Sequence, residues 1–267
     1  MGRLGIIAGG GGLPRRLQAA ARAQAWPFYT LGLRGQADAA TSPDAWVRMG
    51  AAGKAIDLLK AEGVDTLVMA GHVRRPALAE LKPDFRTLQL FARLGRRALG
   101  DDTLLRAVAQ ELEREGFRII APHELDPTLL SPVGLLSRRQ PDADEQADIA
   151  RGIEVARTLG NLDVGQGCVV QQGIVLAVEA VEGTDAMLAR CQKLRRKGAG
   201  GVLVKACKPQ QDTRIDLPTI GLRTLTRAYQ AGLSGIAVQA GASLLLDQDE
   251  VRATADRLGL FVTGFSA

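Results

Sequence analysis

Aromatic residues and cysteines are both scarce in this sequence, and each shortage excludes a class of protein. Aromatic residues make up 4% of the 267 residues, too few for the stacking platforms of single-strand nucleic-acid binders. The three cysteines, Cys168, Cys191 and Cys207, form no Cys-x-x-Cys pair, so neither a disulfide framework nor a cysteine-ligated zinc site is expected. We therefore expect a protein of a reducing cytoplasm that does not bind nucleic acid.

Long apolar runs and several familiar catalytic motifs are also missing. No run reaches the roughly eighteen apolar residues of a membrane-spanning helix, and the run Leu4–Ala8 is too short for a signal peptide. Gly-x-Ser-x-Gly, a Walker A loop and a zinc-protease motif are absent, which argues against the corresponding enzyme classes. Any contact with a membrane is therefore expected to be peripheral.

The net charge of +5 is spread along the chain in short, separated basic runs such as Arg74-Arg75 and Arg195-Arg196-Lys197. Distributed arginine suits ligands that bear phosphate, or an anionic membrane face. Plain solubility explains the same pattern. Charge alone therefore does not choose between these interpretations.

Apolar strand-like runs alternate with amphipathic helical patterns, which predicts βαβ units and largely parallel sheets. The expected strands are Leu4–Ala8, Phe28–Leu31, Thr66–Ala70, Arg118–Ala121, Cys168–Gln171, Val175–Ala180, Val202–Lys205, Ile236–Gln239 and Leu260–Val262. The expected helices are Leu13–Ala25, Lys54–Glu62, Asp101–Glu115, Asp144–Leu159, Asp185–Arg196, Leu222–Ala231 and Asp249–Leu258.

The alternation lapses between Pro122 and Pro141, which predicts a linker over 125–143. We therefore predict an α/β protein with two domains, 1–124 and 144–267. The first is expected to be Rossmann-like and the second to carry the acidic catalytic loops. Ligands commonly bind between two such domains, so a ligand cleft is expected there.

A glycine-rich loop follows the first strand and opens the first helix. At Gly10, Gly11 and Gly12 the backbone can approach a ligand closely and present N–H groups to phosphate. The spacing is not Gly-x-Gly-x-x-Gly, and Leu31–Arg34 stands where a ribose-binding acid is expected. The loop is therefore either a phosphate cradle or a tight turn, and a nicotinamide-dependent enzyme is disfavoured.

Two further loops of the first domain carry groups suited to phosphate. Gly71–Pro76 contains His72 and Arg75, and an arginine there can clamp phosphate. Gly100, Asp101, Asp102 and Thr103 open a helix, where they form either a phosphate seat or an ordinary helix cap.

Two acidic loops follow strands of the second domain. Glu179, Glu182 and Asp185 come after an apolar run, and their carboxylates suit a magnesium ion. The alternative is that Asp185 is a helix-terminal acid and Glu182 a solvated turn residue.

The second acidic loop, Lys205–Gly221, packs four charged residues into nine positions. Lys208 can reach a phosphate, and Asp212, Arg214 and Asp216 share one face of an extended chain. Such a set can hold a metal and a phosphate oxygen, as water attack on phosphorus requires. A salt-bridged surface loop is the alternative.

Several motifs together resemble the LpxI-type UDP-2,3-diacylglucosamine pyrophosphatases, over almost the whole chain and in order. They are GIIAGGGGLP (5–14), GHVRRP (71–76), GDDTLLRAV (100–108), EGFRIIAPHEL (115–125), LDVGQG (162–167), VLAVEAVEGTDAMLAR (175–190), KPQQDTRIDLPTIG (208–221), AGLSGIAVQAG (231–241) and GLFVTG (259–264).

The resemblance implies hydrolysis of UDP-2,3-diacylglucosamine to 2,3-diacylglucosamine 1-phosphate (lipid X) and UMP, in lipid A biosynthesis. It also implies dependence on Mg²⁺ or Mn²⁺, and action by a cytoplasmic protein at the inner face of the membrane. A non-catalytic lipid or nucleotide-sugar binding protein of the same fold is the alternative, and a homo-oligomer is left open.

The matching motifs imply most of the expected site residues, and Gln171 and Lys205 are added from outside the motifs. Asp216, Asp212 and Glu182 are the expected catalytic acids, and Asp216, Glu179 and Asp185 the expected metal ligands. The expected substrate contacts are Gly10, Gly11, Gly12, Arg75, Gly100, Asp101, Asp102, Thr103, Gln171, Gly183, Thr184, Lys205, Lys208, Arg214 and Thr219.

Overall fold

The computed structural model describes residues 2–74, 81–94 and 101–266. The chain forms two compact units, one of Met1–Pro127 with Asp212–Asp216, the other of Thr128–Gln211 with Leu217–Ala267. The pentapeptide Asp212–Asp216 thus belongs to the N-terminal unit, although the residues on both sides of it belong to the C-terminal unit. None of the helices in the described ranges combines the length and the apolar character that crossing a membrane requires.

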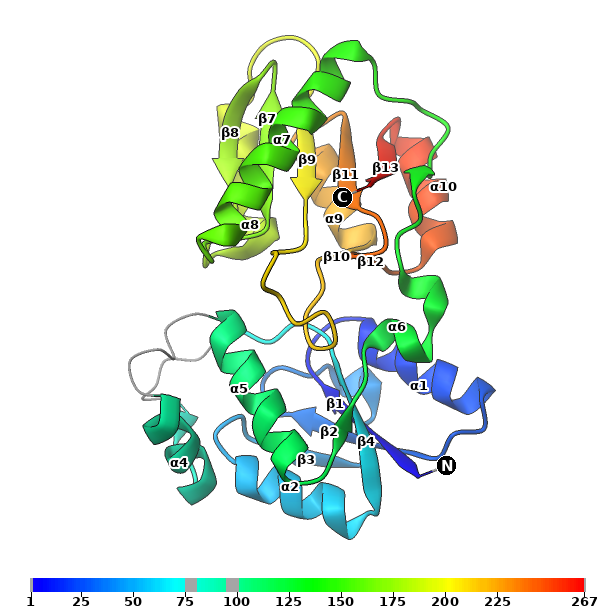
Figure 1. Ribbon diagram of the computed structural model, residues 1–267. Helices are drawn as coiled ribbons and strands as arrows, with labels where there is room; N and C mark the ends of the chain where they lie inside the picture. Colours follow the sequence, from blue (N-terminus) through cyan, green and yellow to red (C-terminus); the bar gives the residue numbers. More distant parts are fainter. Residues whose placement is uncertain (1, 75–80, 95–100, 267) are drawn as a thin grey trace. The chain divides into compact units, whose positions relative to one another are not determined.

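The N-terminal unit is built on a parallel sheet of five strands in the order β3-β2-β1-β4-β5 (Figure 1). The strands are β1 (Arg3–Ala8), β2 (Phe28–Leu33), β3 (Ala45–Val47), β4 (Val64–Ala70) and β5 (Arg118–Ile119). This is the order of a doubly wound sheet, in which the chain first builds outward to β3 and then returns to β4. The predicted Rossmann-like domain is confirmed.

Helices cover both faces of this sheet (Figure 1). They are α1 (Leu13–Ala23), α2 (Ala52–Ala61), α5 (Asp101–Arg114) and the short α6 (Pro122–Leu125), while α4 (Phe85–Leu94) packs against α2 and α5. The core on one face joins Ile56 and Leu59 of α2 and Leu112 of α5 to sheet residues such as Leu31 and Leu67. Apolar residues one turn apart on each helix make this burial possible.

The C-terminal unit contains a mixed sheet of six strands in the order β6-β13-β11-β9-β7-β8. The parallel strands are β9 (Val202–Lys205), β11 (Gly235–Gln239) and β13 (Phe261–Phe265). The antiparallel strands are β6 (Gly134–Leu135), β7 (Gly167–Gln171) and β8 (Ile174–Val178). A separate parallel pair joins β10 (Thr219–Ile220) to β12 (Leu244–Leu245). The second sheet is therefore mixed, where a largely parallel one was predicted, because a tight hairpin joins β7 to β8.

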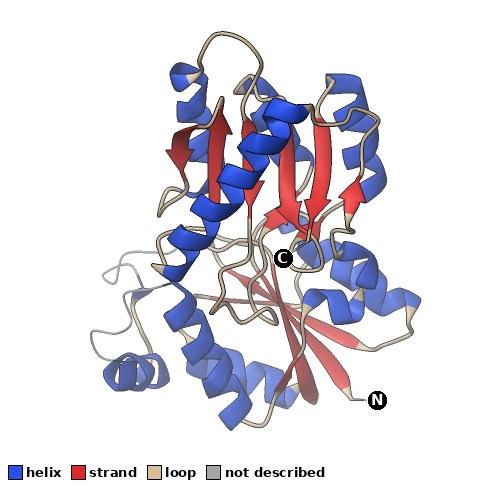
Figure 2. Ribbon diagram, turned by 45° about the horizontal axis from the view of Figure 1, so that its top comes forward, coloured by secondary structure: helices blue, strands red, loops and turns tan. Residues whose placement is uncertain are grey.

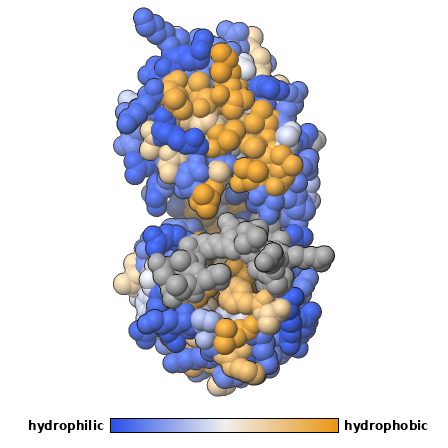
Figure 3. All heavy atoms as spheres, turned by 90° about the vertical axis from the view of Figure 1, so that its left-hand side faces the viewer, coloured by the Kyte–Doolittle hydropathy of each residue, from blue (hydrophilic) through white to orange (hydrophobic). Residues whose placement is uncertain are grey.

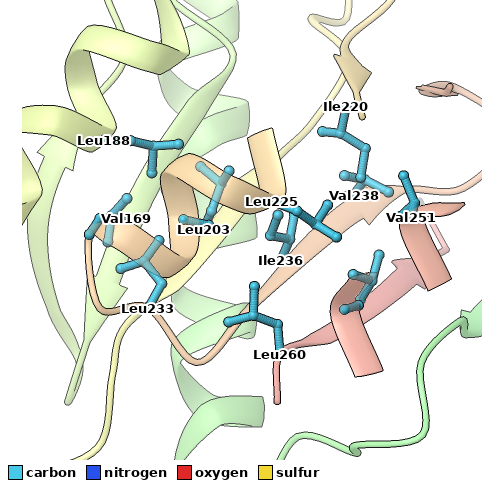
Figure 4. Packing of buried hydrophobic residues seen from close by; sticks show 14 of the residues in the cluster. Val169, Leu188, Leu203, Ile220, Leu225, Leu233, Ile236, Val238, Val251 and Leu260 are labelled. Carbon is cyan, nitrogen blue, oxygen red and sulfur yellow. The ribbon is translucent and has the colours of Figure 1, made fainter. Parts of the chain in front are cut away.

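Helix α7 (Ala143–Asn161) lies across one face of the six-stranded sheet (Figure 2). The other face packs against α8 (Gly183–Leu194), α9 (Leu222–Gln230) and α10 (Gln248–Leu258). Figure 4 shows this second core, where Leu188 and Leu225 meet Val169, Leu203 and Ile236 of the strands. Strands covered on both faces are apolar throughout, which explains why Val202–Val204 carries no polar residue.

The predicted linker over 125–143 is not a linker in the structure. Residues 128–143 belong to the C-terminal unit, where β6 pairs with β13. The Leu136 N–H donates to the Val262 carbonyl at 2.8 Å. Prolines interrupt the hydrophobic periodicity of this segment. Strand β6 has only two residues, which are too few to show an alternating pattern. The segment is held by backbone hydrogen bonds instead.

Asp148 on α7 fixes the hairpin between β7 and β8. Its carboxylate accepts the N–H groups of Gln172 at 2.9 Å and Gly173 at 2.6 Å. Both turn residues have positive φ, 55° and 74°, the combination that a two-residue hairpin turn demands. Asp148 is only 3% exposed, whereas the two turn residues that it holds are exposed.

Replacing Asp148 by alanine is expected to lower the free energy of unfolding by about 2–3 kcal/mol, since two charge-assisted hydrogen bonds to the turn are lost. Urea denaturation measures this. Asp144→Ala, an exposed acid on the same helix, is the matched control and is expected to cost under about 1 kcal/mol. Equal losses in the two variants would contradict the role of Asp148.

Candidate functional site

The glycine-rich loop after β1 packs against the loop after β4. Gly10 and His72 exchange two backbone hydrogen bonds, of 2.8 and 3.0 Å. A Cβ atom built on Gly10 would lie 2.6 Å from Cε1 of His72, and one on Gly9 would lie 2.6 Å from the His72 carbonyl oxygen. Glycine is required at both positions because no side chain fits. The tight-turn interpretation therefore explains Gly9 and Gly10.

Gly11 and Gly12 are arranged differently. The Gly11 N–H donates to Oδ2 of Asp38 at 2.9 Å, so a carboxylate already sits against the loop. Gly12 is exposed, and a Cβ built there would meet no atom within 4 Å. Helix α1 begins directly afterwards, without a side-chain cap and without an acid in its first turn. This half of the loop leaves room for a ligand, and phosphate binding by Gly11 and Gly12 stays a prediction.

The other residues of this unit that were predicted to bind phosphate lie wholly or partly outside the described residues. Arg75 and Gly100 lie outside the described residues. Asp101, Asp102 and Thr103 begin α5, but their side chains lie outside the description too. Their predicted roles stay predictions.

Ionic hydrogen bonds among Asp212, Arg214 and Glu113, here called the clamp, hold the segment Asp212–Asp216 on the N-terminal unit. Arg214 binds Asp212 through two hydrogen bonds, Nε to Oδ1 at 3.0 Å and Nη2 to Oδ2 at 2.7 Å. Its Nη1 also donates to Oε1 of Glu113 on α5 at 2.6 Å, and Ile215 packs against the apolar core. The predicted phosphate arginine and its neighbouring acid are thus bound to each other.

Backbone hydrogen bonds connect the clamp to Asp216. The Asp212 carbonyl oxygen accepts the N–H of Ile215 at 3.0 Å and that of Asp216 at 3.1 Å. The hydrogen bonds from Arg214 hold the pKa of the Asp212 carboxyl below its usual value, against the opposing effect of burial. Because the folded pKa is lowered, the clamp contributes fully at neutral pH and is lost only below about pH 4. Asp212 therefore helps to fix the backbone at Asp216, and its predicted catalytic role stays a prediction.

Replacing Arg214 by lysine is expected to speed hydrogen exchange at the Ile215 and Asp216 amides by about tenfold or more. A lysine ammonium group lacks the planar set of N–H donors with which the guanidinium binds Asp212 and Glu113 together. Glu113→Gln should give a smaller increase. Exchange measured by mass spectrometry on peptides spanning 210–217 tests this. Unchanged exchange in Arg214→Lys would show that the clamp does not hold the segment.

In the C-terminal unit, three predicted site residues meet where β9 ends and α8 begins. Lys205 donates to the Thr184 hydroxyl at 2.7 Å, which donates to Oε1 of Glu179 at 2.7 Å. Nζ of Lys205 lies 3.7 Å from Oε2 of Glu179, and that oxygen has no hydrogen-bond partner among the described residues. Lys205 is 3% exposed and Glu179 7%, so this is a buried ion pair bridged by a hydroxyl.

The other acids of the same loop face cations. Glu182 pairs with Arg190 of its own helix, and Asp185 pairs with Arg223 of α9. Gly183 has a φ of +78°, a backbone conformation that favours glycine at the start of α8. The alternative interpretation, in which Asp185 and Glu182 are helix-terminal and surface residues, describes these contacts.

The structure does not support the predicted contact between Gln171 and the substrate. Gln171 lies at the opposite end of β7 from Gly167, the residue that pairs with Lys205. Its fully buried amide donates to the carbonyl oxygens of Arg196 at 3.1 Å and Ala199 at 2.5 Å, and accepts the Arg196 N–H at 2.9 Å. These bonds fix the loop after α8 and leave no group for a substrate, so Gln171 is structural.

Lys208 and Thr219 also have partners inside the protein. Nζ of Lys208 lies 2.8 Å from Oδ1 of Asp163, a partner the sequence did not suggest. The Thr219 hydroxyl donates to the Leu217 carbonyl oxygen at 3.0 Å. Neither contact excludes a substrate, and both assignments stay predictions.

A dedicated metal cage is absent from the part of the chain that the structure describes, since no three histidine, cysteine or acidic side chains gather there. Of the three predicted ligands, Glu179 faces Lys205 and Asp185 faces Arg223. A metal ion would compete with an ammonium or guanidinium group at either place. Glu179 and Asp185 therefore do not suit the predicted metal role, and the predicted metal role of Asp216 stays a prediction.

Two family models account for nearly the whole chain. The model described as the LpxI N-terminal domain matches residues 3–129, and that described as the LpxI C-terminal domain matches residues 132–263. The chain belongs to the LpxI family. A curated relative, the UDP-2,3-diacylglucosamine pyrophosphatase LpxI of Caulobacter vibrioides, is 47% identical over 273 residues, which cover 99% of this chain and 98% of the relative. The predicted family membership is confirmed.

The boundary between the two LpxI domain models falls near the point where the chain passes from one compact unit to the other, after Pro127. Sequence reasoning missed three charged residues in this LpxI chain: Asp38, Glu113 and Asp163. Asp38 had a usable signal, because it is the first acid after β2. Glu113 and Asp163 had none, since each meets its partner only through the tertiary structure.

Proposed function

We propose that this protein is a UDP-2,3-diacylglucosamine pyrophosphatase of lipid A biosynthesis. Water adds to one phosphorus of the pyrophosphate, and the bond from that phosphorus to the bridging oxygen breaks. The bridging oxygen keeps the electron pair, so the products are UMP and 2,3-diacylglucosamine 1-phosphate. The observation that supports this most is the 47% identity to the Caulobacter vibrioides pyrophosphatase over both domains.

Asp216 is the residue we assign to the reaction. It follows the clamp of Arg214 and Asp212, which fixes its backbone on the N-terminal unit. A carboxylate carried on a backbone held in this way can orient the attacking water and accept its proton. Glu182, which was predicted as a third catalytic acid, is left out because Arg190 neutralises it.

A divalent cation, Mg²⁺ or Mn²⁺, is part of the proposal. Mg²⁺ is commonly held by one or two carboxylates together with substrate phosphates and water, without an all-protein cage. Asp216 would supply the carboxylate. When bound, such an ion neutralises phosphate charge and lowers the pKa of water.

We also propose peripheral contact with the cytoplasmic membrane, on the face of the C-terminal unit that carries β8 and α8. Figure 3 shows apolar residues gathered on this face. Ile174, Val181 and Leu194 are 46%, 93% and 47% exposed, and Leu194 stands within the exposed basic run from Lys193 to Lys197. Apolar groups among cations suit an anionic lipid surface. Loss of flotation with anionic vesicles in Leu194→Ser would support this; unchanged flotation would contradict it.

The activity is tested with the purified full-length chain and UDP-2,3-diacylglucosamine dispersed in detergent with Mg²⁺ or Mn²⁺. Release of UMP, followed by chromatography, is the expected result, and a chelator should stop it. Recovery of intact substrate bound to the protein, without UMP under either ion, would support the non-catalytic alternative. UMP release that persists in chelator would overturn the metal requirement alone.

A further inference from the structure

Helix α4 exposes large apolar side chains to solvent. Phe85 is 74% exposed and Leu88 is 52% exposed, and Gln89 and Ala92 are exposed as well. These four positions form one face of the helix, because residues three, four and seven apart lie on the same side. Of the six phenylalanines, all of which the structure describes, Phe85 alone is exposed.

Phe85 and Leu88 lie one turn apart and therefore form a patch, here called the α4 patch. Figure 3 shows apolar residues on the side of the N-terminal unit that carries α4. A single exposed apolar residue needs no explanation, whereas apolar residues that adjoin one another commonly mark a binding surface. The α4 patch therefore calls for a partner.

Polar contacts hold α4 on the N-terminal unit from its other side. Asp84, just before the helix, accepts the Thr87 N–H at 2.9 Å and the Gly53 N–H of α2 at 2.8 Å. The buried Thr87 hydroxyl donates to the Gly50 carbonyl oxygen at 2.9 Å. Leu90, one turn further along, is buried too. The helix is thus positioned by its inner face, which leaves the α4 patch free for a partner.

The charges around the α4 patch suit an anionic partner. Between Lys82 and Arg93 the single acid is Asp84, and its carboxylate already accepts backbone N–H groups. The neighbouring acids on α5 each bind two cations, Glu111 with Arg93 and Arg114, and Glu115 with Arg86 and Lys60. A second copy of this surface would bring like charges together, so self-association is disfavoured and an anionic lipid surface is favoured.

We infer, on the basis of the proposed action at a membrane, that α4 docks the N-terminal unit on an anionic bilayer. Phe85 and Leu88 enter the boundary between the lipid headgroups and the acyl chains, and Lys82 and Arg93 stay at the level of the headgroups. An amphipathic helix with phenylalanine and leucine on one face and basic residues beside them lies in the plane of the interface in this way. This contact is separate from the one proposed for β8 and α8, which belong to the other unit.

The test measures lipid binding, so it does not depend on turnover. The full-length chain is floated with phosphatidylcholine vesicles that contain or lack phosphatidylglycerol, and the wild type should prefer the anionic vesicles. Phe85→Ser combined with Leu88→Ser is expected to lower partition into them by about tenfold or more, because less apolar area leaves water. Tyr229→Ser removes a 52% exposed residue of α9 and is the matched control, which should partition as the wild type does.

A second variant, Phe85→Trp, reports insertion directly. Tryptophan suits the membrane interface, so binding should be kept. The emission that this variant adds to that of Trp26 and Trp46 should move to shorter wavelength with anionic vesicles. Lipids brominated in their acyl chains should quench it.

Partition of the double variant equal to that of the wild type, or emission at position 85 that brominated lipids do not quench, would overturn the docking role of α4. A raised KM for detergent-dispersed substrate with unchanged partition would instead assign the α4 patch to the substrate acyl chains. Loss of a dimer in sedimentation of the double variant, again with unchanged partition, would assign it to a second copy. A chain that docks through α4 but releases no UMP would refute the proposed reaction and leave the docking helix standing.

Discussion

Replacing Asp216 by asparagine is expected to reduce UMP release by about 10²–10⁴-fold, the usual contribution of a positioned acid or base. Asparagine keeps the shape of the side chain and removes the negative charge that would orient water and hold the cation. The clamp side chains Asp212, Arg214 and Glu113 are unchanged in this variant, and hydrogen exchange on peptides spanning 210–217 checks that the segment stays in place. Initial rates at saturating substrate and saturating Mg²⁺ measure the loss.

Thr213→Ala is the matched control for Asp216→Asn. Thr213 is an exposed residue of the same pentapeptide, and its replacement is expected to leave the rate within about twofold, as is usual for surface changes. Unfolding curves for both variants should superimpose on that of the wild type. A rate for Asp216→Asn close to that of Thr213→Ala, with folding intact, would remove Asp216 from the reaction.

Replacing Lys205 by methionine is expected to lower the free energy of unfolding by about 3–5 kcal/mol, the cost of breaking a buried ion pair. The pair with Glu179 is almost completely shielded, and one oxygen of Glu179 lacks a hydrogen bond among the described residues even with Lys205 present. Removing the ammonium group leaves a buried charge that keeps the hydrogen bond from the Thr184 hydroxyl. Urea denaturation at neutral pH measures the change.

Two further variants separate the buried charge from the loss of packing. In Lys205→Met combined with Glu179→Gln, no buried charge is left, and most of the lost stability should return. Lys60→Met removes one partner of the more exposed pair with Glu115 and is expected to cost under about 1 kcal/mol. If the double variant is as unstable as Lys205→Met alone, packing and not charge explains the loss.

The alternation of strands and helices was visible in the sequence because local spacing and burial produce it. The apolar runs Leu4–Ala8 and Val202–Lys205 became strands at the predicted positions. The turn at Gly9–Gly12 was predicted between the right elements. By contrast, β6 and the pair of β10 with β12 have two residues per strand, too few to show a periodicity. They exist because the backbone finds partners distant in sequence.

Site residues were harder to predict because residue type does not reveal a partner. Lys205 was expected to contact substrate and Glu179 a metal, yet they bind each other through Thr184. Gln171 ends a buried strand as predicted. Its amide, however, donates to the carbonyl oxygens of Arg196 and Ala199, which lie 25 and 28 residues further along the chain. A polar group that is buried must be satisfied, and only the fold determines by what.

The sequence by itself determined the family, the two α/β domains and the residue types suited to phosphate chemistry, because local patterns and motif strings carry that information. Only the tertiary structure decided which groups meet. It placed Asp212–Asp216 with the N-terminal unit, on Glu113 of α5, and it brought Asp38 against the glycine-rich loop. Both are contacts between residues far apart in the chain, and they form only when strand order and register bring the loops together.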